Sequence, residues 1–285
     1  MSMVLRRGVA ADAPLVGEIC YRAFSSLADL HNFPRDFPNA DIAAQMLSQR
    51  IADPGCFDLV AEIDGRIVGS TILDERNPVC GVGPITVDPE VQNDGIGRAL
   101  MEAMLNRSRE RRFPGIRLVQ AGYHCRSLAL YLKLGFEARE QLACLQGNPI
   151  GKAVPGCTLR TATRDDLAVC NQLCFRVHGH DRGGELADMI DAGVARVVER
   201  AGRITGYTTS IAFHGHAIGE SNDDLQALIA GAASFEGPGF LVPTRNGALL
   251  RWCLQQNLRI TQTMTLMSIG LYNTPDGAWL PSVTY

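Results

Sequence analysis

The sequence predicts a mixed α/β protein with two similar halves, each a mostly antiparallel mixed sheet flanked by helices. Its 285 residues exceed what one hydrophobic core usually holds and suit two cores of about 140 residues each. Residues 5–22 and 159–176 align without a gap and share a leucine, two arginines, an aspartate and a cysteine. The motif E-x-x-G-R-I-x-G then occurs at 62–69 and again at 199–206. Two repeats in the same order indicate an internal duplication.

Each half is expected to open with a short strand and to continue with an amphipathic helix. An acid, Asp12 in the first half and Asp166 in the second, stands near the start of that helix, where a capping residue is typical. Two apolar runs follow, joined by the pair DG at 64–65 and by AG at 201–202. Because DG between β-rich runs favours a tight turn, we expect a hairpin in each half.

The rest of the first half alternates between strands and helices. Strands are predicted at 81–89, 116–121 and 136–145, and helices at 96–112 and 125–134. In the longer helix, Ile96, Leu100 and Met104 recur at helical spacing, and the basic C-terminus suits the helix dipole. The predicted order β-α-α-β-β-β-α-β-α-β excludes an all-parallel doubly wound sheet and an all-β sandwich.

The segment QGNPIGKAVPG, residues 146–156, is the predicted linker because it holds two prolines and three glycines. We therefore expect a first domain at 1–147, a linker at 148–156 and a second domain at 157–285.

The composition is that of a soluble globular protein, with 46% hydrophobic and 20% charged residues. A net charge of -3 argues against a nucleic-acid partner, and no apolar stretch reaches the length of a signal peptide core or a membrane span. Cys170 and Cys174 lie one helical turn apart without a second pair at zinc-site spacing. We expect reduced thiols, a cytoplasmic location and no metal site.

The stretch QNDGIGRAL, residues 92–100, predicts a phosphate-binding loop that opens a helix. A dinucleotide fingerprint lies directly after the first strand, whereas this loop follows the fourth predicted strand. It also needs a third small residue at the position that Leu100 occupies here. A P-loop needs lysine after its second glycine, where this sequence has Arg98. Neither pattern fits.

The pattern Q-x-x-G-x-G, carried by Gln92, Gly95 and Gly97, resembles the acyl-coenzyme A signature of the GNAT (GCN-related N-acetyltransferase) superfamily. The run LALYLKLGF at 128–136 is similar to the second signature of that family, L-Y-x-x-x-G-F. The resemblance covers most of residues 3–145. It implies tandem GNAT-like domains and an N-acetyltransferase that moves the acetyl group of acetyl-CoA to a primary amine by direct attack in a ternary complex.

The resemblance also implies how acetyl-CoA is held. Backbone groups of Ile85 and Val87 would bond the acetyl carbonyl and the pantetheine arm on a strand that splays from its neighbour, and an N–H there would stabilise the oxyanion. Glycines would let the backbone approach the pyrophosphate at the helix N-terminus. The loop residues implied in this contact, after Gln92, are Asn93, Asp94, Gly95, Ile96, Gly97, Arg98 and Ala99.

Tyr131 corresponds to the general acid of the family, which protonates the departing thiolate; the other interpretation is a core tyrosine. His124 stands where relatives often have asparagine, and it could order a water, titrate near neutrality or merely be solvated. Relatives often carry a glutamate base where this sequence has Gly81. A water chain or the carboxylate of Tyr285 could act instead, so the base stays open.

The acceptor side is implied to lie at the loop 27–40, where His31, Phe33 and Phe37 could wall a pocket or only pin the loop down. The acceptor could be a small-molecule or a peptide amine, and the protein could be a monomer or a homodimer. The other function that fits is a non-catalytic acyl-CoA-binding or sensing protein, suggested by the missing glutamate and by Asp94 in the loop.

The second half is expected to be degenerate. Glu220, Asp223 and Asp224 stand where a second glycine loop would bind phosphate, and Cys253 aligns with Tyr131. Carboxylates repel an anion, so we expect residues 157–285 to bind no acyl-CoA and to shape the site of the first half. Near the end of the chain, Trp279, like the terminal tyrosine, is a candidate for the pocket or, as we favour, for the core.

Overall fold

The computed structural model describes residues 3–284, so a prediction on Tyr285 lies outside the described residues. The first half follows the predicted order of strands and helices. Its elements are β1 (Met3–Arg6), α1 (Ala13–His31), α2 (Ala40–Ala52), β2 (Cys56–Ile63), β3 (Arg66–Asp74), β4 (Cys80–Val87), α3 (Ile96–Glu110), β5 (Gly115–Ala121), α4 (Cys125–Lys133) and β6 (Glu137–Gln146). The mixed α/β prediction is therefore confirmed.

The second half repeats much of this order in a shorter form. Its elements are β7 (Thr158–Thr161), α5 (Leu167–His178), α6 (Gly183–Asp191), β8 (Arg196–Arg200), β9 (Arg203–Thr208), β10 (Ala217–Gly219), α7 (Asn222–Ala230), β11 (Phe240–Pro243), α8 (Gly247–Gln255), β12 (Arg259–Gly270) and β13 (Ala278–Leu280). Within residues 3–284, no helix is both long and apolar enough to cross a membrane.

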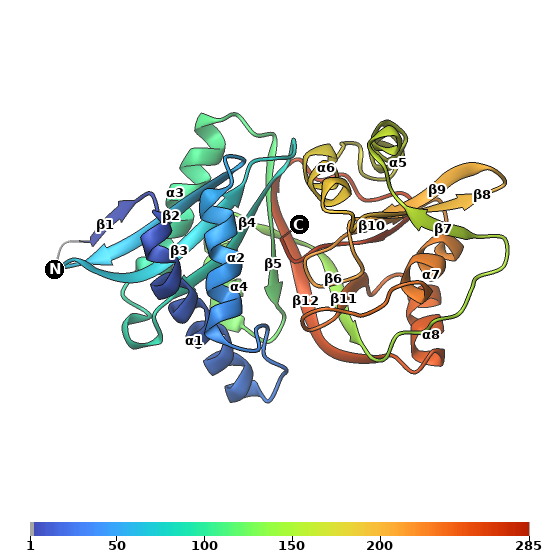
Figure 1. Cartoon of the computed structure of the whole chain (residues 1–285). Helices are drawn as coiled ribbons and strands as arrows, with labels where there is room; N and C mark the ends of the chain where they lie inside the picture. The colour runs from blue at the N-terminus through green and yellow to red at the C-terminus, as the bar shows by residue number, and fades with distance from the viewer. Residues whose placement is uncertain (1–2, 285) are drawn as a thin grey trace.

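Two sheets contain these strands, and the larger one combines both halves (Figure 1). Its eight strands run in the order β1-β2-β3-β4-β5-β12-β6-β11, while the second sheet has the order β13-β10-β9-β8-β7. Strand β12 of the second half thus lies between β5 and β6 of the first, antiparallel to both. The sequence did not predict this exchange of strands. A division of the chain at 148–156 stays a proposal, since both halves supply strands to one sheet.

The repeats found in the sequence occupy equivalent places in the structure. Arg6 pairs with Asp12 at 2.6 Å and with Glu62 at 2.6 Å. In the second half Arg160 pairs with Asp166 and with Glu199, each at 2.7 Å. Each of these aspartates also accepts a backbone N–H three residues earlier in the chain. Identical ion-pair triads built from aligned residues support the interpretation as a duplication.

Helices cover the two faces of the larger sheet (Figure 1). Helices α1 and α2 pack on one face, in a core that includes Val60 and Ile72. Helices α3 and α4 pack on the other face, against Leu59, Ala61 and Leu73. The alternation of neighbouring residues between the two cores follows from the two-residue period of a strand. The candidate site opens where this sheet splits.

Candidate active site

The site begins at a split in the larger sheet. Strands β4 and β5 pair in parallel only at Cys80 with Ile116 and at Gly81 with Arg117, and they then diverge. On its other edge β4 stays paired with β3 as far as Val87. A cavity of about 820 Å³ opens in the split, within the size range of small-molecule sites. One edge of β4 therefore presents unpaired backbone groups to this cavity.

The glycine loop lies at one end of the cavity. Gly95 has a φ of 82°, in the region that favours glycine, and α3 starts at the next residue without a side-chain cap. The N–H groups of the first turn of a helix have no intrahelical partner, and the dipole favours an anion there. A Cβ on Gly97 would lie 3.7 Å from Cγ2 of Val87 and 3.9 Å from Cδ2 of Leu130. Since all three residues line the cavity, glycine keeps this space free for a ligand.

Most of the residues that the family signature implied do line the cavity. These are Ile85, Val87, Gln92, Asn93, Gly95, Ile96, Gly97 and Arg98. Asp94 and Ala99 are not among the lining residues, and the side chain of Asp94 is exposed to solvent. The acid inside the loop thus lies away from the cavity.

Arg126 of α4 reaches across to the loop, a contact that the sequence did not predict. Its guanidinium donates to Oε1 of Gln92 and to Oδ1 of Asn93, the latter at 3.1 Å. The amide of Gln92 donates in turn to the carbonyl of Val87 at 3.1 Å. Arg98 and Lys133 also line the cavity. Cationic side chains therefore gather at the glycine-loop end, where the diphosphate of a nucleotide-like ligand would fit.

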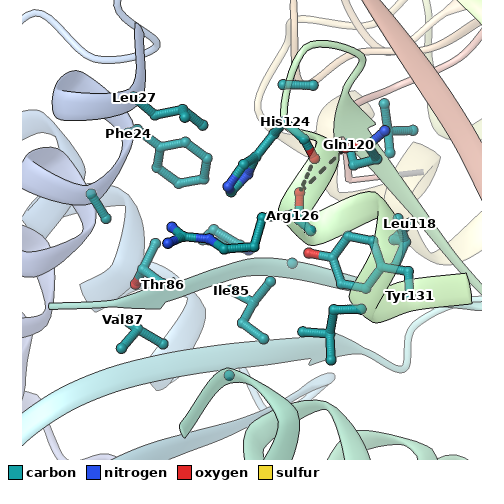
Figure 2. A pocket seen from close by; sticks show the side chains of 18 of the residues that line it. Phe24, Leu27, Ile85, Thr86, Val87, Leu118, Gln120, His124, Arg126 and Tyr131 are labelled. Atoms are coloured by element: carbon teal, nitrogen blue, oxygen red, sulfur yellow. Dashed lines mark hydrogen bonds between the residues drawn. The ribbon is translucent and has the colours of Figure 1, made fainter. Parts of the chain in front are cut away.

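Tyr131 lies on α4 and is 6% exposed, with its ring packed edge-on against Phe136 at 6.0 Å. Figure 2 shows its hydroxyl directed into the cavity, toward the strand that carries Ile85. Burial raises the pKa of Tyr131 well above its ordinary value, so the phenol keeps its proton at neutral pH. The hydroxyl can therefore donate a proton or a hydrogen bond inside the cavity.

His124 also lines the cavity, just before α4 (Figure 2). Burial, with Arg126 and His31 nearby, lowers the pKa of His124 to about 4, so the ring is neutral at pH 7. The sequence left open that His124 titrates near neutrality, and its environment in the structure does not support this. Its buried Nε2 has no hydrogen-bond partner in the described part of the chain, which agrees with a role in ordering water. Gln120 beside it has an unpartnered Nε2 as well.

The aromatic residues of the loop 27–40 have two different positions. Phe37 lines the cavity and packs near Phe24, with 6.1 Å between ring centroids. Phe33 instead stacks on Tyr123 at 4.3 Å, and His31 contacts the same ring at 5.2 Å. Neither of these two lines the cavity. Phe37 thus walls the cavity, while Phe33 and His31 support Tyr123, which does line it.

Sequence reasoning missed the residues that the second half contributes. They are Phe213, His214, Gln262, Met264, Val283 and Thr284. Two of them lie on β12, whose insertion beside β5 follows from no local pattern in the sequence. The last two, Val283 and Thr284, follow β13 and line the cavity beside residues of the first half. Asp36, in the loop between α1 and α2, was missed as well.

The equivalent helix start in the second half is closed. The carboxylate of Asp224 is fully buried at the start of α7 and accepts from the backbone N–H of Ser221 at 2.9 Å. It also accepts from Thr205 at 2.6 Å. Glu220 is paired with Arg203 at 2.7 Å. Two of the three carboxylates that the sequence placed at this position therefore have protein partners: Asp224 caps the helix and Glu220 pairs with arginine.

Two other residues of the second half lie in the core. Cys253 and Trp279 are both buried, and neither lines the described cavity. Trp279 packs edge-on against His178 at 5.2 Å. The core interpretation of Trp279 agrees with this position.

A mixed sheet that splits beside an uncapped helix N-terminus, with a tyrosine in the same cavity, is the arrangement of the GNAT fold. Residues 24–136 match the acetyltransferase (GNAT) family. The matched stretch is less than half of the chain, and proteins of that family use acetyl-CoA.

A curated relative supports the assignment for the same region. The mycothiol acetyltransferase of Saccharomonospora viridis is 34% identical over 111 residues, which cover 35% of this chain and 36% of that protein. The match thus spans about a third of the length of this relative.

Solved structures show the same fold over nearly the whole chain. A Pyrococcus horikoshii protein assigned as an acetyltransferase has a TM-score of 0.74 at 17% identity, covering 97% of this chain and 94% of the other. A tandem GNAT protein from the clavulanic acid biosynthesis pathway has a TM-score of 0.59 at 16% identity, covering 94% and 98%. At such identities the likeness concerns the fold alone, and it includes a tandem arrangement.

Proposed function

We propose that this protein transfers the acetyl group of acetyl-CoA to a primary amine and that the first half carries the reaction. The observation that supports this most is the meeting of three features in one cavity. These are the open N-terminus of α3, the unpaired edge of β4 and the protonated hydroxyl of Tyr131. Acetyl-CoA supplies an acetyl group activated as a thioester.

The residues of this chain have separate roles in the proposal. The backbone N–H groups of residues 93–98 and the guanidinium of Arg126 would bind the diphosphate, whereas the N–H of Ala99, predicted to take part, already donates to the carbonyl of Gly95 at 3.0 Å. The backbone at Ile85 and Val87 would bond the pantetheine arm and the acetyl carbonyl, where a fixed donor stabilises developing negative charge. Tyr131 would give its proton to the departing thiolate. His124 would order a water.

The second half has a supporting role in the proposal. Residues 157–285 would bind no acyl-CoA, because Asp224 occupies the only equivalent helix start that the described repeat offers. They would complete the acceptor end of the cavity through β12 and the segment before β10. The nine cysteines are unpaired, which agrees with a reducing cytoplasm, and the choice between monomer and homodimer stays open.

The first experiment is thermal unfolding with and without acetyl-CoA. A ligand at about 100 times its dissociation constant stabilises the native state by roughly 2.7 kcal/mol, which raises the melting temperature. No shift at millimolar acetyl-CoA would contradict the proposal.

A non-catalytic acyl-CoA sensor is the second candidate, because Gly81 replaces the base of relatives and lies where β4 still pairs with β5. The two candidates differ in turnover. An enzyme loses thiol release in Tyr131→Phe while its affinity for coenzyme A is kept. A sensor releases no thiol in either form with any amine.

A further inference from the structure

The acceptor end of the cavity holds a single carboxylate among the described lining residues, that of Asp36. It makes no hydrogen bond or ion pair with any residue of 3–284. Three groups from different elements nonetheless lie close enough to interact with it electrostatically: Cys20 of α1, Tyr123 after β5 and Cys144 of β6. Asp36 is therefore a half-buried carboxylate at the cavity wall that no described side chain pairs with.

A second polar group at this end also lacks a partner. Gln262 of β12 is 3% exposed, lines the cavity and pairs in register with Cys144. Neither its amide nitrogen nor its amide oxygen has a hydrogen-bond partner in the described part of the chain, although its side chain lies near the Cys144 thiol. A buried amide without partners costs free energy, so a ligand that bonds it would be favoured. Since both lie near Cys144, Gln262 and Asp36 face the same end.

The remaining wall of this end is apolar. Phe24 and Met46 come from the helices of the first half, and Phe213 and Met264 from the second. The cations that line the cavity, Arg98, Arg126 and Lys133, belong to the glycine loop and α4. The pKa of His214, whose side chain is exposed, is lowered by desolvation and by the charge of Arg50. A carboxylate on the acceptor would therefore find no described cation to pair with there.

We propose that the acceptor is a primary amine on an apolar group that carries one uncharged hydrogen-bonding function and no carboxylate. Its ammonium binds Asp36, its amide or hydroxyl bonds Gln262, and its apolar part packs among Phe24, Met46 and Phe213. This assignment rests on the proposed acetyl transfer and adds the substrate class.

The same contact gives the proton of the amine a destination. The ammonium gives one proton to the Asp36 carboxylate, and the free amine then attacks the thioester carbon. As the C–N bond forms and the C–S bond breaks, Tyr131 gives its proton to the thiolate. The second proton leaves the nitrogen and restores the phenol, and the proton on Asp36 passes to solvent. The products are the amide, the free thiol and one proton.

The pH dependence of kcat/KM offers a separate readout. Burial raises the pKa of Asp36 to about 6, so the carboxylate becomes neutral and loses its hold on the ammonium as the pH falls through this value. We expect kcat/KM to fall below about pH 6. The groups that face Asp36, namely Cys20, Tyr123 and Cys144, all have pKa values raised by burial and stay neutral in this range. His124 and His214 also line the cavity, and the pKa values of both are lowered.

Three probes test the substrate class: phenylalaninamide, phenylalanine and 2-phenylethylamine. Each is titrated calorimetrically into the complex of the full chain with coenzyme A, and thiol release from acetyl-CoA is followed in parallel. We expect the amide to bind and react at least about tenfold better than the free amino acid, with phenylethylamine between them. Equal or better use of phenylalanine would overturn the proposal.

Two variants and a control locate the contacts. Asp36→Asn should lower kcat/KM for the amide about 100-fold or more and abolish the fall in kcat/KM below about pH 6, with acetyl-CoA affinity unchanged. Gln262→Leu should lower kcat/KM for phenylalaninamide to the value for phenylethylamine and leave kcat/KM for phenylethylamine unchanged. Asp29→Asn, which removes an exposed acid paired with Arg35, is the matched control. It should change neither kcat/KM for the amide nor its pH dependence.

The outcomes separate this proposal from the proposed function. If acetyl-CoA binds and other amines react while none of the probes binds, the substrate class is wrong and acetyl transfer stands. If no acetyl-CoA binds at all, the proposed function fails first. Unchanged pH and amide kinetics in Asp36→Asn would remove Asp36 from the reaction.

Discussion

Helices α3 and α7 start at equivalent places in the two halves, but only one start is open. At α3, Gly95 turns the chain with a φ of 82° and no side chain caps the first turn. At α7, Ser221 and Asp224 form a reciprocal capping box, and the carboxylate is fully buried. In both helices the N–H groups of the first turn lack an intrahelical partner, and the dipole has the same direction. The comparison teaches that a helix N-terminus becomes a ligand site only where the chain leaves it unoccupied.

The strands that precede these helices also differ, because the edge of β4 is open and the edge of β10 is paired. Strand β4 loses its neighbour after Gly81, which leaves the split that forms the cavity. In the second half, β13 pairs along the whole of β10, from Ala217 with Leu280 to Gly219 with Ala278. The unpaired edge of β4 in the first half is thus matched by a closed edge of β10 in the second. In the second half, Asp224 therefore occupies the helix start and β13 occupies the strand edge.

The largest effect is expected where the two halves differ in chemistry. Tyr131→Phe should lower kcat about 100-fold or more, because the thiolate loses its proton donor, with coenzyme A affinity unchanged. Thiol-release kinetics and calorimetry measure the two quantities. Cys253→Ala changes the aligned residue in the core of the second half and should leave kcat unaltered at a temperature where the variant is folded. An equal loss in both variants would contradict the assignment of roles.

The second prediction removes the cap of α7. Asp224→Ala should lower the free energy of unfolding by about 2–4 kcal/mol, because helix α7 loses its capping carboxylate and the Thr205 hydroxyl loses its charged acceptor. Urea unfolding followed by circular dichroism measures the change. The variant should gain no second acetyl-CoA site, because β13 still fills the strand edge. Binding of a second molecule would show that the cap alone closes this half.

The third prediction compares two arginines near the helix starts. Arg126→Ala should weaken coenzyme A binding about tenfold, a modest value because the side chain is largely exposed. Arg203→Ala breaks the pair with Glu220 in the second half and should leave the affinity unaltered. Calorimetric titration at two salt concentrations measures both, and the Arg126 effect should shrink at high salt. Equal affinities in the two variants would remove Arg126 from the site.

The smallest effect is expected at the acid of the glycine loop. Asp94 is exposed and does not line the cavity, so its backbone can bind an anion while the carboxylate faces solvent. Asp94→Arg should tighten coenzyme A binding about twofold, through a favourable but screened charge near the helix start. A large loss of affinity in the same titration would mean that the carboxylate itself takes part in the loop structure.

The sequence predicts the fold of the first half well because its signals are local. Apolar spacing, the turn at 64–65 and the glycine loop each act within a few residues. The aligned residues of the duplication form equivalent ion-pair triads in the structure, although the alignment itself predicted only the aspartates near the helix starts. The exchange of β12 could not be predicted, because strand neighbours far apart in the chain depend on the assembled sheet.

The candidate site likewise has a part that local sequence motifs predict and a part that depends on long-range packing. The cofactor end follows from contiguous motifs around Gly97 and Tyr131. The proposed acceptor end depends on Asp36, Gln262 and His214, which stand in no motif, and Gln262 reaches the cavity on the exchanged strand β12. Arg126 had a local signal, since it lies one turn of α4 before the tyrosine signature. Sequence patterns therefore indicate what holds the acyl donor better than what selects the acceptor.

The most direct test of the comparison is the number of acetyl-CoA molecules bound by the whole chain. Isothermal titration of the intact protein should give one molecule per chain, and Gly97→Val, which fills the space in front of Val87 and Leu130, should abolish binding. Asp224→Ala should still bind one. Two molecules per chain, or one that persists in Gly97→Val, would contradict the claim that the open start of α3 is the acyl-CoA site and that α7 is closed.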